Sequence, residues 1–188
     1  MSEMTPLREA QAVLGNADCL HDAAAVNAAY DSLAARLAQA YAARNPLLLC
    51  VMIGGLAPTA AITERLKFPF ELDYLHATRY RGATHGGGLV WKRQPDAARV
   101  AGRDVLVIDD ILDEGHTLVA IRAALEQFRP ASLEVCVLAE KLHDRRAKGA
   151  LAEYIGLQVE DRYVFGCGMD AKGYWRNLPT IRALTTNV

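Results

Sequence analysis

The chain contains few cysteines and no pattern of a cysteine framework. Four cysteines are spread over 188 residues, and no two form a C-x-x-C pair. Cys50 and Cys136 lie inside apolar runs, where free cysteine behaves as a small hydrophobic residue. The histidines add little support for a metal site, because neither His85 nor His116 has ligand spacing to another histidine or cysteine. We therefore expect free core thiols in a protein of a reducing compartment.

Long hydrophobic runs and an excess of one charge are also missing. No apolar segment approaches the length needed to cross a membrane, and the N-terminal MSEMTPLREAQ lacks the apolar stretch of a signal peptide. Lysine and arginine number 21 against 22 aspartates and glutamates, without a basic block. A broad electrostatic surface for nucleic acid or anionic membrane is therefore not evident. We expect a cytoplasmic protein with neither nucleic acid nor a membrane as a partner.

The remaining composition is that of an ordinary globular protein. Hydrophobic residues make up 52% of the chain and charged residues 23%, which is well away from the composition of disordered segments. A chain of 188 residues has room for a sizeable core, and no internal repeat divides it. We expect residues 1–188 to form a single domain.

Helical and strand patterns alternate along the chain. The first 45 residues have a helical pattern, with Thr5 as a cap before Pro6 and a second helix from about Asp22. Strand patterns cover 47–53, 70–80, 89–93, the run from 105 and 131–142; helical patterns cover 58–66 and the segment ending near 128; 94–102 is a polar loop. The last 35 residues change to short strands. This alternation predicts an α/β domain with a parallel sheet covered on both faces.

One stretch combines a buried strand with four acidic residues. VLVIDDILDEGHTLVAI begins as an apolar strand, and Asp109 and Asp110 stand where that strand is expected to end. Helix capping is one interpretation of these aspartates. Ligand binding is the other, because ligands of open α/β sheets lie beyond the carboxyl ends of the strands. The turn at 113–117 opens a helix whose free N–H groups favour a phosphate, so a phosphorylated sugar fits both features.

The segment VLVIDDILDEGHT resembles the phosphoribosyl pyrophosphate signature of the type I phosphoribosyltransferases, with Glu114 where Thr or Ser is usual. The resemblance implies a type I phosphoribosyltransferase-like α/β fold, in which a central parallel sheet is flanked by helices. The core would cover about 20–142, and a small hood about 150–188 together with the N-terminal segment. Mg²⁺ is the implied cofactor, with Asp109, Asp110 and Asp170 as its ligands. The residues implied for phosphoribosyl pyrophosphate are Ile53, Gly54, Gly55, Asp109, Asp110, Asp113, Glu114, Gly115, His116, Thr117 and Arg176.

Other segments are similar to the hypoxanthine-guanine branch of that family. VMIGGLAPTA resembles its pyrophosphate loop, and Lys141 follows the fourth strand like the lysine that contacts the purine. YVFGCGMDAKGYWRNLP is similar to the hood of the branch. The implied lid contains Thr78, Arg79 and Tyr80. The residues implied for the purine are Lys141, Tyr163, Val164, Met169 and Asp170.

The resemblance implies an enzyme of purine salvage. It would transfer the 5-phosphoribosyl group from phosphoribosyl pyrophosphate to hypoxanthine or guanine, giving IMP or GMP and pyrophosphate. Asp113 is the implied general base for the proton of the purine N7. Two alternatives stay open, a xanthine-preferring enzyme and a regulatory RNA-binding protein on the same fold. The resemblance alone also implies a homodimer or homotetramer.

Overall fold

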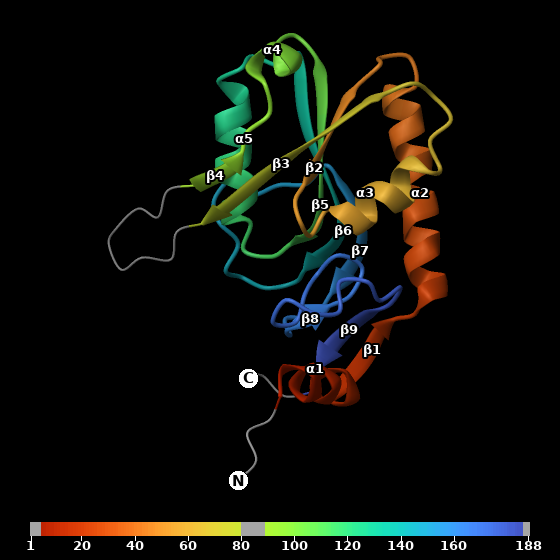
Figure 1. The fold of residues 1–188 in the computed structure, drawn as a ribbon. Helices are drawn as coiled ribbons and strands as arrows, with labels where there is room; N and C mark the ends of the chain where they lie inside the picture. Colours follow the sequence, from red (N-terminus) through yellow and green to blue (C-terminus); the bar gives the residue numbers. More distant parts are fainter. Residues whose placement is uncertain (1–4, 80–88, 186–188) are drawn as a thin grey trace.

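The strands form two sheets of unequal size (Figure 1). The computed structural model describes residues 5–79 and 89–185. The larger sheet has the strand order β4-β3-β2-β5-β6-β7, and the smaller sheet has the order β1-β9-β8. The strands are β1 (Ala17–His21), β2 (Leu47–Val51), β3 (Glu71–Arg79), β4 (Leu89–Arg93), β5 (Asp104–Leu112), β6 (Ser132–Lys141), β7 (Tyr154–Val159), β8 (Val164–Phe165) and β9 (Ile181–Leu184). The helices are α1 (Pro6–Gly15), α2 (Ala23–Tyr41), α3 (Leu56–Thr63), α4 (Ala97–Val100) and α5 (His116–Glu126).

The larger sheet confirms the α/β architecture that the sequence predicts. Strands β2, β3, β5, β6 and β7 run parallel to their neighbours. Strand β4 returns antiparallel to β3. All five residues of β2 are buried, because helices cover both faces of the sheet.

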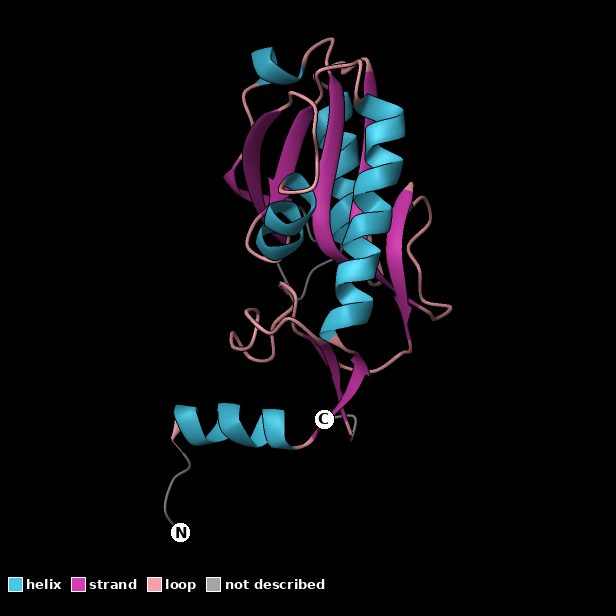
Figure 2. Ribbon diagram, turned by 90° about the vertical axis from the view of Figure 1, so that its right-hand side faces the viewer, coloured by secondary structure: helices cyan, strands magenta, loops and turns pink. Residues whose placement is uncertain are grey.

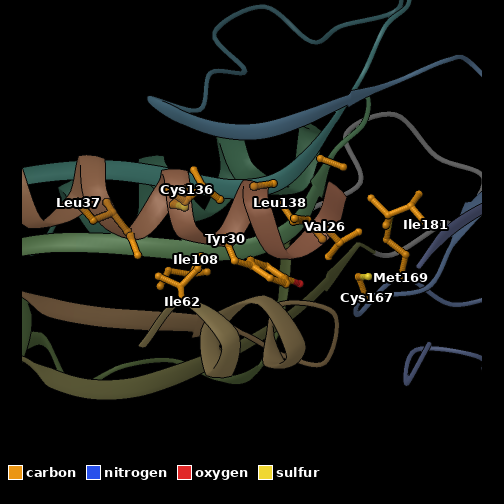
Figure 3. Packing of buried hydrophobic residues seen from close by; sticks show 14 of the residues in the cluster. Val26, Tyr30, Leu37, Ile62, Ile108, Cys136, Leu138, Cys167, Met169 and Ile181 are labelled. Atoms are coloured by element: carbon orange, nitrogen blue, oxygen red, sulfur yellow. The ribbon is translucent and has the colours of Figure 1, made fainter. Parts of the chain in front are cut away.

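Successive residues of the central strands supply two separate cores. Leu48 of β2 packs toward α2 and α3, whereas Leu47 and Leu49 pack in the second core with residues of α5. Figure 3 shows the first core, where Tyr30 of α2 and Ile62 of α3 lie close to side chains of the sheet. Burial on both faces explains why these strands are continuous apolar runs in the sequence.

Helix α2 covers one face of the larger sheet along much of its length (Figure 2). Asp22 caps its start, where the side-chain Oδ1 accepts the N–H of Ala25 at 2.8 Å. Within residues 5–79 and 89–185, no helix is long and apolar enough to cross a membrane. The face of α2 against the sheet repeats at three- and four-residue steps and includes the buried residues Val26, Tyr30, Leu33, Leu37 and Tyr41.

The cysteines behave as the sequence predicts. All four are free. Cys50 and Cys136 are buried in the strands that carry them, and Cys167 is also buried. Burial raises the pKa of the Cys136 thiol to about 12, so this thiol stays protonated at neutral pH.

Three elements differ from the sequence-based expectation. Residues 17–21, which were expected to be helical, form β1, because they pair antiparallel with β9 near the C-terminus. Residues 97–100, within the expected polar loop, form α4, where the carboxylate of Asp96 accepts the N–H of Ala98 at 2.9 Å. Strand β7 lies in the larger sheet, beyond the core boundary expected near residue 142.

The smaller sheet joins the two ends of the chain into a hood, defined here as β1, β8, β9 and the loop 166–180. The hood lies below the carboxyl ends of the parallel strands in Figure 1. Arg162 holds it together, because its Nη2 donates to the carboxylate of Asp18 at 2.5 Å and to the carbonyl of Leu184 at 2.7 Å. Trp175 Nε1 donates to the carbonyl of Ala10 at 2.8 Å, which attaches α1 to the same unit.

Candidate active site

A cleft of about 640 Å³ lies at the carboxyl ends of β2, β3 and β5 and reaches Arg176 of the hood. Ligands of open α/β sheets bind at this edge. Nine of the eleven residues expected to bind phosphoribosyl pyrophosphate line the cleft, whereas Ile53 and Gly55 do not. Its lining residues are Val51, Met52, Gly54, Ala77, Thr78, Asp109, Asp110, Ile111, Asp113, Glu114, Gly115, His116, Thr117, Leu118 and Arg176.

Two adjacent carboxylates occupy the floor of the cleft. Strand β5 continues to Leu112, so Asp109 and Asp110 lie among its last four residues, near the carboxyl end of the strand where the sequence predicts them. Asp109 Oδ1 accepts the N–H of Asp110 at 2.9 Å, and Asp110 Oδ1 accepts the N–H of Ile111 at 2.7 Å. These backbone donors fix both side chains within the strand.

Burial gives this carboxylate pair unusual proton affinity. Burial raises the pKa of Asp109, and the nearby negative charge of Asp110 raises it further. Burial also raises the pKa of Asp110. Two anions in such a position need either a cation or hydrogen-bond donors from a ligand.

The carboxylate pair fits a divalent cation that takes its other ligands from a substrate. Among residues 5–79 and 89–185, no cluster of three or more His, Cys, Asp or Glu side chains could enclose a metal ion. Mg²⁺ keeps several water or substrate oxygens and often takes only one or two carboxylates from a protein. Asp109 and Asp110 are oxygen donors of that kind.

Glycine is required where the loop after β2 meets Asp110. A Cβ at position 54 would overlap the carboxylate of Asp110, and a Cβ at position 168 would overlap the carbonyl of Gly54. Gly168 also has φ +107°, a conformation that other residues rarely adopt. The loop after β2 packs against the carboxylate of Asp110, and the hood packs against that loop. Both contacts are too close for a side chain at position 54 or 168. Ile53 is 49% exposed and does not line the cleft.

The turn at 113–117 forms the start of α5. Gly115 has φ +79° as the N-cap residue, and a Cβ there would also overlap Ala150. The carbonyl of Glu114 accepts the N–H of Ala147 at 2.8 Å. The segment after β6 therefore packs against the turn and is hydrogen-bonded to it. The first N–H groups of α5 have no partner within the helix and are suited to a phosphate.

A second pocket of about 220 Å³ adjoins the cleft. It contains all five residues expected to bind the purine, which come from β6, from the hood and from Tyr163 just before β8. Lys141 and Met169 are buried, whereas Tyr163 is 45% exposed at the pocket edge. The lining residues are Asp110, Ile111, Asp113, Lys141, Tyr163, Val164, Met169 and Asp170.

Asp113 is held by two side chains, one of which sequence reasoning missed. Its Oδ2 accepts from Lys141 Nζ at 2.6 Å, and its Oδ1 lies 2.7 Å from His143 Nε2. Burial alone would raise the pKa of Asp113, but the hydrogen bonds from Lys141 and His143 outweigh it and hold the pKa below its ordinary value. His143 follows Lys141 by two residues, and that nearness is the one signal in the sequence that could have drawn attention to it.

The hood residues Asp170 and Arg176 pair with each other. Arg176 Nη2 lies 2.6 Å from Asp170 Oδ1, and Arg176 Nη1 donates to the carbonyl of Gly168 at 2.6 Å. Asp170 Oδ2 accepts the N–H of Gly173 at 2.7 Å. Both carboxylate oxygens of Asp170 are thus engaged within the hood.

The expected lid residues are described only in part. Thr78 lines the cleft at the end of β3. Arg79 is the last residue of β3. Tyr80 lies outside the described residues.

The fold and this pair of pockets define an α/β domain with a ligand site at the carboxyl edge of its parallel sheet. The family model of the phosphoribosyl transferase domain matches residues 16–172. The chain belongs to this phosphoribosyltransferase family.

Relatives and solved structures of the family resemble the chain over most of its length. Hypoxanthine-guanine-xanthine phosphoribosyltransferase of Tritrichomonas foetus is 35% identical over 156 residues, which cover 83% of this chain and 85% of the relative. Hypoxanthine-guanine phosphoribosyltransferase of Streptococcus pneumoniae strain R6 is 29% identical over 163 residues, with 87% and 90% covered. The crystal structure of a hypoxanthine phosphoribosyltransferase from Staphylococcus aureus has a TM-score of 0.82 at 26% identity and covers 89% of this chain and 91% of its own.

Proposed function

We propose that this protein transfers the 5-phosphoribosyl group of phosphoribosyl pyrophosphate to hypoxanthine or guanine, as an enzyme of purine salvage. The observation that supports this best is that the 640 Å³ cleft and the 220 Å³ pocket lie next to each other. Asp110, Ile111 and Asp113 line both pockets, so ligands in the two pockets would meet at these residues. An enzyme that joins a sugar to a base needs such adjoining sites.

The larger cleft suits phosphoribosyl pyrophosphate. The turn at 113–117 would bind the 5-phosphate through backbone N–H groups at the start of α5. Asp109 and Asp110 would hold the two ribose hydroxyls directly or through a metal. The loop at 53–55 and the guanidinium of Arg176 would contact the diphosphate, since a guanidinium binds phosphate oxygens in a fixed fork.

Mg²⁺ is the cofactor that we propose for this cleft. Asp109 and Asp110 would hold it together with substrate oxygens, and Asp170 would join them after releasing Arg176. When bound, Mg²⁺ stabilises the negative charge that develops on the departing pyrophosphate.

The reaction joins a purine ring nitrogen to C1 of the ribose. The new C–N bond forms as the bond between C1 and the diphosphate oxygen breaks, and the electron pair leaves on pyrophosphate. The proton lost from the purine N7 passes to Oδ2 of Asp113. A general base of this kind contributes on the order of 10²–10⁴ in rate.

Lys141 would select the base. An ammonium group has only donors, so it can satisfy a carbonyl oxygen at position 6 of the purine and cannot accept from the amino group of adenine. Tyr163 and Met169 would cover the two faces of the ring, and Val164 would present backbone groups to its edge. Xanthine is a second candidate substrate, because the relative from Tritrichomonas foetus is named for all three bases.

A homodimer or homotetramer is also part of the proposal. Leu56, Leu72 and Tyr74 line one apolar groove near α3 and β3, and all three are exposed. Burying such a groove against another copy would remove apolar surface from water. Sedimentation equilibrium would give the mass in solution, and a monomer at micromolar concentration would contradict this part.

Product formation tests the proposed function. Purified protein would be incubated with phosphoribosyl pyrophosphate, MgCl₂ and one of hypoxanthine, guanine, xanthine or adenine. We expect IMP and GMP with an equal amount of pyrophosphate, little AMP, and no turnover in excess EDTA. Full turnover in EDTA would contradict the Mg²⁺ proposal, and the absence of nucleotide with every base would contradict the function.

A further inference from the structure

His143 is buried against the carboxylate of Asp113. Its side chain is only 2% exposed, although it follows the end of β6 in a connecting segment. Its Nε2 lies 2.7 Å from Asp113 Oδ1, and its Nδ1 accepts the backbone N–H of Arg145 at 3.0 Å. Both ring nitrogens are therefore in use.

These two contacts fix the tautomer of the ring. Because the N–H of Arg145 donates to Nδ1, that nitrogen carries a lone pair and no hydrogen. The hydrogen of the neutral ring must then be on Nε2, from which it points to Asp113 Oδ1. The arrangement is a directed chain from the backbone of Arg145 through His143 to Asp113.

The two oxygens of Asp113 have different partners, and this difference matters for catalysis. Lys141 holds Oδ2, and His143 holds Oδ1. When Lys141 donates instead to the carbonyl oxygen of a bound purine, Oδ2 of Asp113 would be free to accept the N7 proton. Oδ1 would stay bonded to His143, so the carboxylate would keep its orientation when Lys141 leaves.

We propose that His143 is a positioning residue, which orients Asp113 by one hydrogen bond and keeps it ionised while Lys141 is occupied by the purine. This inference rests on the proposed function. Other charged groups also lie near Asp113. Arg145 lies 3.8 Å from Glu114 and pairs with Asp161 at 2.8 Å, and the carboxylates of Asp110 and Asp170 line the same pocket as Asp113. Among the described residues, Lys141 and His143 are the side chains bonded to Asp113.

Two substitutions separate positioning from local structure. In His143→Asn the amide oxygen can still accept the N–H of Arg145, but the shorter side chain does not reach Asp113. In His143→Gln the amide N–H can reach the place of Nε2 and donate to Asp113. His21→Leu is the matched control, because His21 is bonded to the carbonyl of Gln158 and lies in β1.

The readouts are kcat, the KM for phosphoribosyl pyrophosphate, the melting temperature, and the acidic limb of kcat/KM for hypoxanthine against pH. For His143→Asn we expect kcat to fall about 10- to 100-fold, the range for one hydrogen bond to a charged group. The KM should change less than about three-fold, since the phosphoribosyl site is intact. The acidic limb should move up by about one pH unit, because a lost donor raises the pKa of Asp113. His143→Gln should recover most of kcat and the parental limb.

Two results would overturn the proposal. One is a His143→Asn variant with parental kcat and an unmoved acidic limb. The other is an equal loss in the Asn and Gln variants with a lowered melting temperature and an unmoved limb, which would make His143 a structural residue. If the Asn variant does not fold, the Gln variant decides. A folded His143→Gln variant whose acidic limb differs from that of the parent also overturns the proposal. The parent must form IMP in the same assay, so an inactive parent would count against the proposed function and not against His143.

Discussion

The ammonium of Lys141 lies 2.6 Å from Oδ2 of Asp113 in the free site. The group proposed to select the base is thus paired with the group proposed to accept its proton. A 6-oxopurine would exchange this ion pair for two contacts, its carbonyl to Lys141 and its N7–H to Asp113. Adenine has an amino group at position 6 and offers Lys141 no acceptor there. Lys141 would then either stay paired with Asp113 or become a buried donor without a partner.

Replacing the proposed base should slow the reaction more than it weakens sugar binding. We expect Asp113→Asn to lower kcat by roughly 10²–10⁴, the contribution of a general base. The KM for phosphoribosyl pyrophosphate should stay within a few-fold, because the interaction acts mainly in the transition state. Steady-state kinetics, with single-turnover measurements to show that chemistry limits the rate, would check this. Unchanged single-turnover rates would remove Asp113 from the role of base.

The carboxylate pair should cost stability in the absence of ligand. Burial and the charge of Asp110 raise the folded-state pKa of Asp109. The folded protein therefore prefers the protonated form, and ionisation destabilises it above the unfolded pKa of about 4. The penalty is absent well below pH 4 and is complete once the pH exceeds the raised folded pKa.

Asp109→Asn should accordingly raise the melting temperature near pH 7 while it reduces activity. A gain of roughly 2–4 °C corresponds to about 1 kcal/mol in a domain of this size. The gain should shrink toward pH 4. Thermal unfolding without Mg²⁺ at both pH values checks the prediction, and an equal or lower melting temperature at pH 7 would show that Asp109 carries no such penalty.

The contact between Gly54 and Asp110 gives a further prediction. In Gly54→Ala, the new methyl group would overlap the carboxylate of Asp110. A displacement of about 1 Å at such a group can cost about 10² in rate. We expect a lower kcat/KM for phosphoribosyl pyrophosphate and a nearly unchanged fold.

Gly15→Ala provides the matched control, because a Cβ at position 15 meets nothing within 4 Å. Circular dichroism and kinetics on both variants would complete the comparison. Equal kinetics for the parent and Gly54→Ala would mean that Asp110 can move away from the loop without loss of function.

Features encoded by local sequence were predictable. The long apolar runs identified β2, β5 and β6, because strands buried on both faces have few polar residues. The turn ending in Gly115 and Thr117 marked the start of a helix at the edge of the sheet. Asp109 and Asp110 stood out because carboxylates are rare in an otherwise buried strand.

Features created by long-range pairing were not predictable. Strand β1 forms because its partner β9 lies at the other end of the chain, and five residues alone carry too little pattern. His143 reaches Asp113 because β5 and β6 run parallel with Leu112 opposite Glu140. Only this register brings the two segments that follow the strands together. Lys141 and Tyr163 were assigned to the proposed purine site through family resemblance, since nothing in their own neighbourhood marks a purine site.

The ratio of kcat/KM for hypoxanthine to kcat/KM for adenine, measured in the parent and in Lys141→Met, tests most directly whether this site selects 6-oxopurines. A mismatched buried donor costs about 1–3 kcal/mol or more, and sites of this kind can discriminate by roughly 10⁴. We expect the parent to prefer hypoxanthine at least tens-fold and Lys141→Met to lose most of that preference, with the KM for phosphoribosyl pyrophosphate nearly unchanged. The same ratio in both proteins would show that Lys141 does not contact the base and that selectivity comes from the hood.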